Sequence, residues 1–166
     1  MDSRIASIQL DIQHACTDQS IPISDKQLSE WVHTALKPHQ EKAELTVRLV
    51  NLDEITHLNH TYRKKNKPTN VLSFPSNLPK DILLELEHPL LGDIIISPAV
   101  LKEESVALNA PLIAHWAHII IHGVLHLLGY DHIQKSDADI MEALEIKALK
   151  TLGFNNPYAS EDNSLD

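Results

Sequence analysis

A single cysteine, Cys16, is all that the 166 residues contain. One cysteine allows no internal disulfide, so the fold must be stabilised by packing or by a bound metal. The first residues also lack the charged start, the unbroken apolar core and the small-residue cleavage site of a signal peptide. Both absences are typical of a reducing compartment, and we expect a cytoplasmic protein.

The sequence has no uncharged, purely apolar run that is long enough to span a bilayer. Its longest apolar stretch, residues 111–128, is interrupted by four imidazoles, which hydrocarbon would tolerate poorly: His115, His118, His122 and His126. We therefore predict a buried helix here and expect no membrane partner.

Positive charge is scarce, with 14 Lys and Arg against 23 Asp and Glu and a formal net charge of −9. Because affinity for a phosphate backbone usually rests on Lys and Arg, this balance argues against indiscriminate nucleic-acid binding, and we expect no DNA partner. One local exception stands out, a run of four cations within five residues: Arg63, Lys64, Lys65 and Lys67.

Hydrophobic periodicity predicts an α+β fold in a single compact domain, with a mixed sheet of about four strands packed with about five helices. Apolar residues alternate in 8–12 and 43–49, and β-forming residues fill 69–74 and 92–97, which are the four expected strands. Apolar residues at helical spacing predict five helices, over about 24–37, 53–62, 98–108, 111–128 and 136–152. The fourth has no polar face and should be the central buried helix.

Local signals define several ends of these elements. Ser24 with Gln27 resembles a capping box, Asp53 is the expected N-cap of the second helix, and Ser97 precedes a proline at the first position of the third. Ser136 is expected to begin the last helix.

Residues 76–91 show prolines and an apolar patch without a clean period, so we expect a mobile loop. We assign one domain to 1–157 and a disordered acidic tail to 158–166.

The densest chemistry lies between His122 and His132. Residues four apart share one face of a helix, so His122 and His126 can present two imidazoles to one ion. Gly129 lets the chain turn back, and His132 can then supply a third ligand. Three protein ligands leave one position of a tetrahedral zinc ion open, as catalytic zinc sites require. We predict one Zn²⁺ on the central buried helix.

This spacing leaves two alternatives to weigh. His118 and His122 are also four apart, but the helix-ending Gly129 favours the later pair, which makes His115 and His118 core residues or partners of the ligands. The pattern also coincides with that of metzincin proteases, whose first histidine is followed by a glutamate that acts as general base. Here that residue is Gly123, which cannot accept a proton. A peptidase mechanism is therefore disfavoured.

Several motifs together resemble the YbeY family of bacterial endoribonucleases and ribosomal RNA maturation factors. They cover most of the chain and are Glu44-Leu-Thr-Val, Asn59-His-Thr-Tyr-Arg63, Lys67-Pro-Thr-Asn-Val-Leu-Ser-Phe-Pro75, Leu91-Gly-Asp-Ile94, Ala114-His-Trp-Ala-His118 through His132, Met141-Glu-Ala-Leu and Leu152-Gly-Phe154. Residues 81–88 match no pattern of the family.

The resemblance implies a zinc-dependent endoribonuclease specific for single-stranded RNA, acting in small-subunit ribosomal RNA maturation and ribosome quality control. It places the metal histidines on His122, His126 and His132 and the functional arginine on Arg63. A permanently charged guanidinium suits stabilisation of a phosphate in the transition state. We assign catalysis to Arg63 and His122.

Other roles around this site stay open. Arg63 and the lysines at 64, 65 and 67 are assigned to RNA binding, although a charge run is often only a solvated surface. Asp131 could orient a metal histidine or cap a turn, and Asp93 could be loop chemistry; both are left out of catalysis. The implied partners are single-stranded and ribosomal RNA and the small ribosomal subunit with its proteins. A zinc-containing assembly factor without catalysis and a metzincin-like hydrolase are the alternative functions.

Overall fold

The computed structural model describes residues 7–17, 21–131 and 133–158. This part of the chain forms a four-stranded sheet in the order β1-β2-β4-β3, together with six helices. The strands are β1 (Ile8–His14), β2 (Ala43–Leu49), β3 (Val71–Pro75) and β4 (Leu90–Ile96). The first two strands and β4 run parallel, while β3 pairs antiparallel with β4 at the sheet edge. The predicted α+β fold with a mixed sheet is confirmed.

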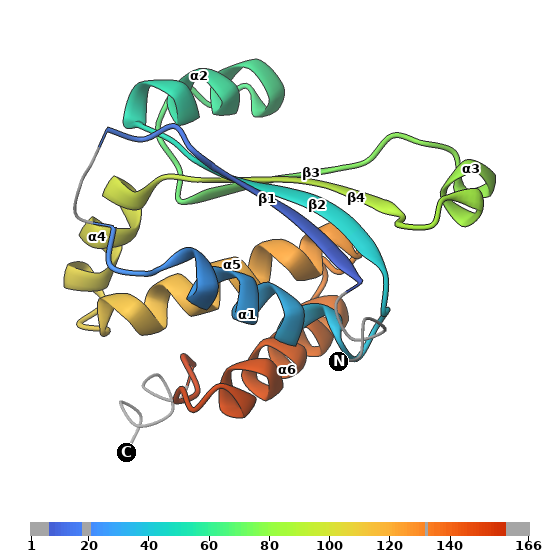
Figure 1. Cartoon of the computed structure of the whole chain (residues 1–166). Coiled ribbons are helices and arrows are strands. Elements are labelled where there is room, and N and C mark those ends of the chain that lie inside the picture. The colour runs from blue at the N-terminus through green and yellow to red at the C-terminus, as the bar shows by residue number, and fades with distance from the viewer. Residues whose placement is uncertain (1–6, 18–20, 132, 159–166) are drawn as a thin grey trace.

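Two helical layers cover the sheet (Figure 1). Helix α2 (Leu52–Arg63) lies on one face, and the larger layer on the other face contains α1 (Asp25–Leu36), α4 (Pro98–Ala107), α5 (Leu112–Leu127) and α6 (Lys135–Thr151). The short helix α3 (Lys80–Glu85) projects beyond the end of the sheet, between β3 and β4.

The larger core lies between the sheet and α5. Strand β2 contributes Ala43, Leu45, Val47 and Leu49, each at most 1% exposed, as their alternation predicts. Helix α5 buries ten of its sixteen residues, among them Trp116, Ile120 and Ile121. It contacts α1, α4, α6, β3 and β4, which confirms the prediction of a central buried helix. Among the described residues, no helix is both long and apolar enough to cross a membrane.

Several predicted helix signals are present in the structure. Ser24 and Gln27 form both hydrogen bonds of a capping box at the start of α1. The Ser97 hydroxyl accepts from the backbone N–H of Val100, and Pro98 occupies the first position of α4. Gly129 has φ +104°, the left-handed conformation that ends a helix.

The predicted N-cap of α2 is wrong. Asn51 is the N-cap, and the Asp53 carboxylate instead accepts from the N–H of Glu54 inside the first turn. A negative charge is favourable anywhere in that turn, so the sequence signal does not fix the boundary. Helix α6 likewise begins at Lys135, one residue before the predicted Ser136.

The expected loop over 76–91 contains a helix, α3, that the prediction missed. None of its six residues is buried, so no stripe of apolar residues marks an inward face. Leucine, lysine and glutamate nevertheless favour a helix, and Pro79 immediately before Lys80 is compatible with its start.

Candidate metal centre and nucleic-acid surface

Two histidines meet near the C-terminal end of α5. The Nε2 atoms of His122 and His126 lie 3.0 Å apart, as expected for residues one turn apart on one helix face. The side chain of His122 is 21% exposed, so the pair lies at the edge of the core and not inside it. Both ring nitrogens are therefore placed where one ion could contact them.

A buried carboxylate from α6 contacts His122, one member of this pair. Glu145 is 1% exposed, and its Oε2 lies 2.6 Å from Nδ1 of His122. Its other oxygen, Oε1, lies 2.7 Å from Nε2 of His118. The hydroxyl of Tyr158 donates to the same Oε1 at 2.5 Å, so three side chains converge on one carboxylate.

These contacts determine the charge of Glu145. Burial by itself would raise the pKa of this carboxyl group, but hydrogen bonds from His118, His122 and Tyr158 outweigh burial and lower the pKa to about 2. Glu145 is therefore ionised at neutral pH and can only accept hydrogen bonds. His122 must then donate through Nδ1, which leaves its Nε2 directed at His126.

The arrangement distinguishes the two candidate histidine pairs. His118 directs its Nε2 at Glu145, whereas His122 and His126 direct theirs at each other. The geometry favours His122 and His126 over His118 and His122, and their role as metal ligands stays a prediction. His115 is separate from both, because it is 8% exposed and its Nε2 lies 2.8 Å from Oε1 of Glu104.

The Glu104 carboxylate is held by its own partners. Burial raises its pKa, but hydrogen bonds from His115 and Asn70 outweigh burial and hold that pKa below its ordinary value. The contact joins α4 to the start of α5, about two turns before His122. It is therefore a structural contact and no part of the facing histidine pair.

The facing pair fits a zinc ion in donor type and spacing. A tetrahedral zinc about 2.0–2.1 Å from two imidazole nitrogens holds them about 3.3 Å apart, close to the 3.0 Å observed. The bond from Nδ1 of His122 to a carboxylate is the usual support of a metal-binding histidine. The predicted third ligand, His132, lies outside the described residues. Without it, the described residues contain no group of three ligands that could hold a metal.

Gly123 lies on the opposite side of α5 from solvent and packs against the sheet. A Cβ atom at this position would lie 3.1 Å from Cγ2 of Ile94, and the hydroxyl of Ser73 donates to the Gly123 carbonyl at 3.3 Å. The glutamate that metzincins carry here would enter the core. The packing of α5 against the sheet therefore disfavours any side chain at position 123 that could act as a general base.

Helix α2, which lies on the other face of the sheet (Figure 1), ends at Arg63. Lys64 follows in a left-handed conformation, φ 62°, and turns the chain back toward β3. Asn59 fixes this turn with two hydrogen bonds. Its side-chain amide donates to the Lys67 carbonyl at 2.9 Å, and its backbone carbonyl accepts from the N–H of Lys65. The cationic loop is thus tied to a buried side chain of α2.

All four cations of this loop are exposed, and within the described part of the chain none of them forms an ion pair with a carboxylate: Arg63, Lys64, Lys65 and Lys67. Beside them, Tyr62 is 64% exposed and contacts Phe74 of β3 edge to face, with ring centroids 5.1 Å apart. Unpaired cations next to an exposed aromatic ring are typical of surfaces that bind single-stranded nucleic acid.

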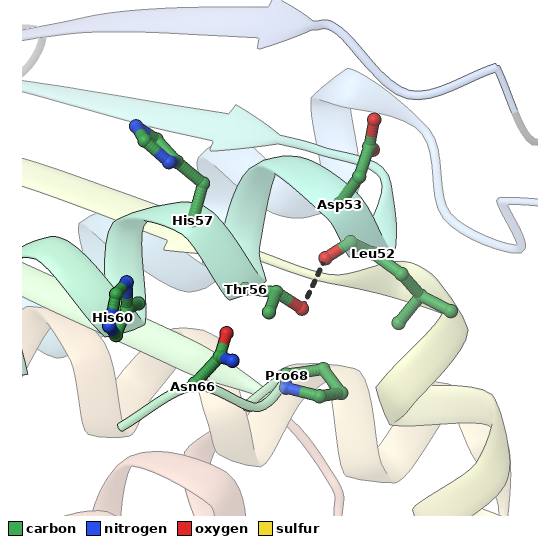
Figure 2. A pocket seen from close by; sticks show the side chains of 7 residues that line it. All are labelled: Leu52, Asp53, Thr56, His57, His60, Asn66 and Pro68. Atoms are coloured by element: carbon green, nitrogen blue, oxygen red, sulfur yellow. Dashed lines mark hydrogen bonds between the residues drawn. The ribbon is translucent and has the colours of Figure 1, made fainter. Parts of the chain in front are cut away.

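An open hollow of about 550 Å³ lies along α2 and the segment 66–68. Figure 2 shows Thr56, His60, Asn66 and Pro68 beside it, with the Thr56 hydroxyl bonded to the Leu52 carbonyl. The hollow is on the same face as the cationic loop and on the opposite face from His122. It can extend the surface available to a polymer but is not the candidate metal centre.

Strand β3 links the two faces. Phe74 touches Tyr62 of α2, and the neighbouring Ser73 bonds to Gly123 of α5. Because β3 is an edge strand, an extended polymer held by the cationic loop could pass around this edge toward the histidine pair. Strand β3 therefore contacts both the helix that precedes the cationic loop and the helix that carries the histidine pair.

The family model described as Endoribonuclease YbeY matches residues 13–153. The chain belongs to the YbeY family. Proteins called Endoribonuclease YbeY from Legionella pneumophila strains Corby, Lens and Paris are each 56% identical to it over 157 residues, which is 95% of this chain and 98% of theirs. A solution structure from Thermotoga maritima, 24% identical, has the same fold with a TM-score of 0.59 over 94% of this chain and 93% of that one.

Within this YbeY fold, the structure brings together two of the three predicted metal ligands, while Arg63 ends α2 on the opposite face of the sheet. Sequence reasoning did not identify Glu145 or Tyr158 as part of the site. The signal for Glu145 was present, because it occupies the same helical stripe as the buried Met141 and Leu149. An acid on an apolar stripe is rarely buried without partners.

Tyr158 falls where the acidic tail was expected to begin, and residues 159–166 lie outside the described part.

Proposed function

We propose that this protein is a zinc-dependent endoribonuclease specific for single-stranded RNA, acting in the cytoplasm on small-subunit ribosomal RNA and in ribosome quality control. Membership of the YbeY family supports RNA cleavage. The single observation that carries the proposal further is the facing pair His122 and His126, with Glu145 behind it. His122, His126 and His132 would hold one zinc ion.

The proposed division of labour follows from chemistry and position. When bound, zinc supplies activation of water near neutral pH and polarisation of a phosphoryl oxygen. Arg63 binds a phosphate and stabilises negative charge that develops on its oxygens, for which a guanidinium is suited. Lys64, Lys65 and Lys67 hold the backbone on either side. Tyr62 offers a ring on which a base can stack, which only an unpaired strand can supply readily.

The direct test incubates purified protein with a single-stranded RNA and with the matching duplex. Wild type should cut the single strand, whereas Arg63→Glu and His122→Ala should not. Lys102→Glu is a matched control, because it makes the same charge reversal at an exposed lysine of α4. Undiminished cleavage by both site variants would mean that a contaminating nuclease is responsible and would remove the basis of the proposal.

The ends of the products give the chemical route. Attack by water on phosphorus leaves no cyclic phosphate, while attack by the ribose 2′-hydroxyl produces a 2′,3′-cyclic phosphate. Mass spectrometry of the fragments distinguishes the two. Fragments with a cyclic end that persist under metal chelation would contradict a metal-dependent reaction.

A second candidate function, ribosome assembly without cleavage, is favoured by α3. This projecting helix and its flanks expose four apolar side chains, which could contact a protein: Leu78, Ile82, Leu84 and Leu86. A strain lacking the natural protein separates the two functions. Rescue of ribosomal RNA processing by folded His122→Ala would favour assembly, and failure of rescue would favour catalysis.

A further inference from the structure

Glu145 is a buried carboxylate beside the histidines, and no catalytic step proposed above uses it directly. It occupies a core position of α6 and is 1% exposed. A carboxylate in such a place is unfavourable unless its oxygens are hydrogen-bonded. Here both oxygens are: Oε2 accepts from His122, and Oε1 accepts from His118 and from the Tyr158 hydroxyl.

The two oxygens separate two tasks. Oε2 fixes the proton of His122 on Nδ1 and thereby the plane of that ring, with Nε2 directed at Nε2 of His126. Oε1 is held by donors from α5 and from the segment after α6, so the carboxylate cannot rotate without breaking bonds to both. The Tyr158 hydroxyl also lies 3.2 Å from Nε2 of His118, which closes this small network.

We propose that Glu145 is a positioning residue for the metal centre: it sets the tautomer and orientation of His122, while His118 and Tyr158 hold Glu145 in place. This inference rests on the proposed zinc site but concerns residues that the zinc would not touch. It also gives the segment that follows α6 a role, since Tyr158 reaches back from it to the carboxylate.

The first test measures zinc affinity of the full-length protein by competition with a chromophoric chelator. Loss of a carboxylate behind a metal-binding histidine typically weakens affinity by about 10–100-fold, and this is the loss expected for Glu145→Gln. Asp139→Asn is the matched control, because it removes one exposed carboxylate from the same helix and should leave affinity unchanged. The stoichiometry should stay at one zinc per chain in all three proteins.

The second test needs neither zinc nor RNA. Nitrogen-15 spectra of the metal-free protein report which ring nitrogen of His122 carries the proton. Wild type should show it on Nδ1, and Glu145→Gln should show a mixture of tautomers. Tyr158→Phe removes one donor and keeps the packing, so it should fold even where Glu145→Gln does not. It should weaken zinc binding by less than Glu145→Gln.

The outcomes separate this inference from the function on which it rests. The positioning role would be overturned, and the zinc site would stand, if Glu145→Gln changed neither the zinc affinity nor the tautomer of His122. If Glu145→Gln does not fold, the same result in Tyr158→Phe would overturn the positioning role. A wild type that binds no zinc but holds the proton on Nδ1 through Glu145 would support positioning and refute the proposed cofactor. Weakened zinc binding together with the tautomer change supports both.

Discussion

Replacing Gly123 by glutamate would restore the residue that follows the first histidine in metzincin proteases, and the structure predicts that the result is an unstable protein and no protease. The Cβ atom would lie 3.1 Å from Ile94 Cγ2 and 3.5 Å from the Ser73 hydroxyl, on the side of α5 that packs against the sheet. The new carboxylate would therefore be directed into the core and away from the facing histidines.

The expected cost follows from two effects. Extra atoms in a packed core destabilise by about 1–3 kcal/mol, and a buried charge without a partner costs about 3–5 kcal/mol. These effects overlap, so we expect a loss of at least about 3 kcal/mol, a large part of the roughly 5–15 kcal/mol that stabilises a typical protein. For a chain of this size that corresponds to a fall in Tm of about 6–12 °C or more.

Urea denaturation followed by circular dichroism measures this loss. Gly123→Ala is the control. Its gain in helix propensity of about 1 kcal/mol opposes the cost of the 3.1 Å contact. The free energy of unfolding of Gly123→Ala should therefore lie within about 2 kcal/mol of that of wild type. A Gly123→Glu protein as stable as wild type, or one that cleaves peptides, would contradict the placement of this residue on the side of α5 that faces the sheet.

Three further predictions concern binding and stability. Tyr62→Ala should weaken binding of a single-stranded RNA by about 5–150-fold, the equivalent of about 1–3 kcal/mol for one stacked base, as measured by fluorescence anisotropy under metal chelation. Tyr62→Phe keeps the ring and should bind normally. An equal loss of affinity in both variants would exclude stacking. Replacing Lys64, Lys65 and Lys67 together by alanine should reduce the slope of log affinity against log salt by about 2, and an unchanged slope would mean that these lysines contact no phosphate. Because hydrogen bonds hold the pKa of Glu104 below its ordinary value, its stabilising contribution is fully present above the ordinary glutamate pKa of about 4.3 and is lost as pH falls through the lowered pKa. Urea denaturation should therefore show Glu104→Gln less stable than wild type at pH 7 and closer to it at pH 3, and a gap that widens in acid would contradict the assignment.

Much of the fold could be predicted because its signals are local. Alternating apolar residues identified β1 and β2, and the Ser24 capping box identified the start of α1. Helix α3 escaped prediction because none of its residues is buried, so its sequence carries no periodic mark of an inward face. Asp53 misled for another reason, since an acid is favourable both before and within the first turn.

Within the candidate site, only the contacts between residues close in sequence could be predicted. His122 and His126 are one helical turn apart, so their proximity follows from the spacing alone. Glu145 lies 23 residues from His122, and only the packing of α6 against α5 brings them together. Arg63 came from resemblance to the family, because a cation at the end of a helix has no pattern that distinguishes catalysis from solvation.

Elemental analysis of the purified protein shows whether the facing histidines His122 and His126 belong to a metal centre. We expect about one zinc per chain in wild type, in line with one three-histidine site, and close to none in a folded His126→Ala protein. Equal metal content in the two proteins, or none in a wild type purified without chelator and supplied with zinc, would contradict this expectation.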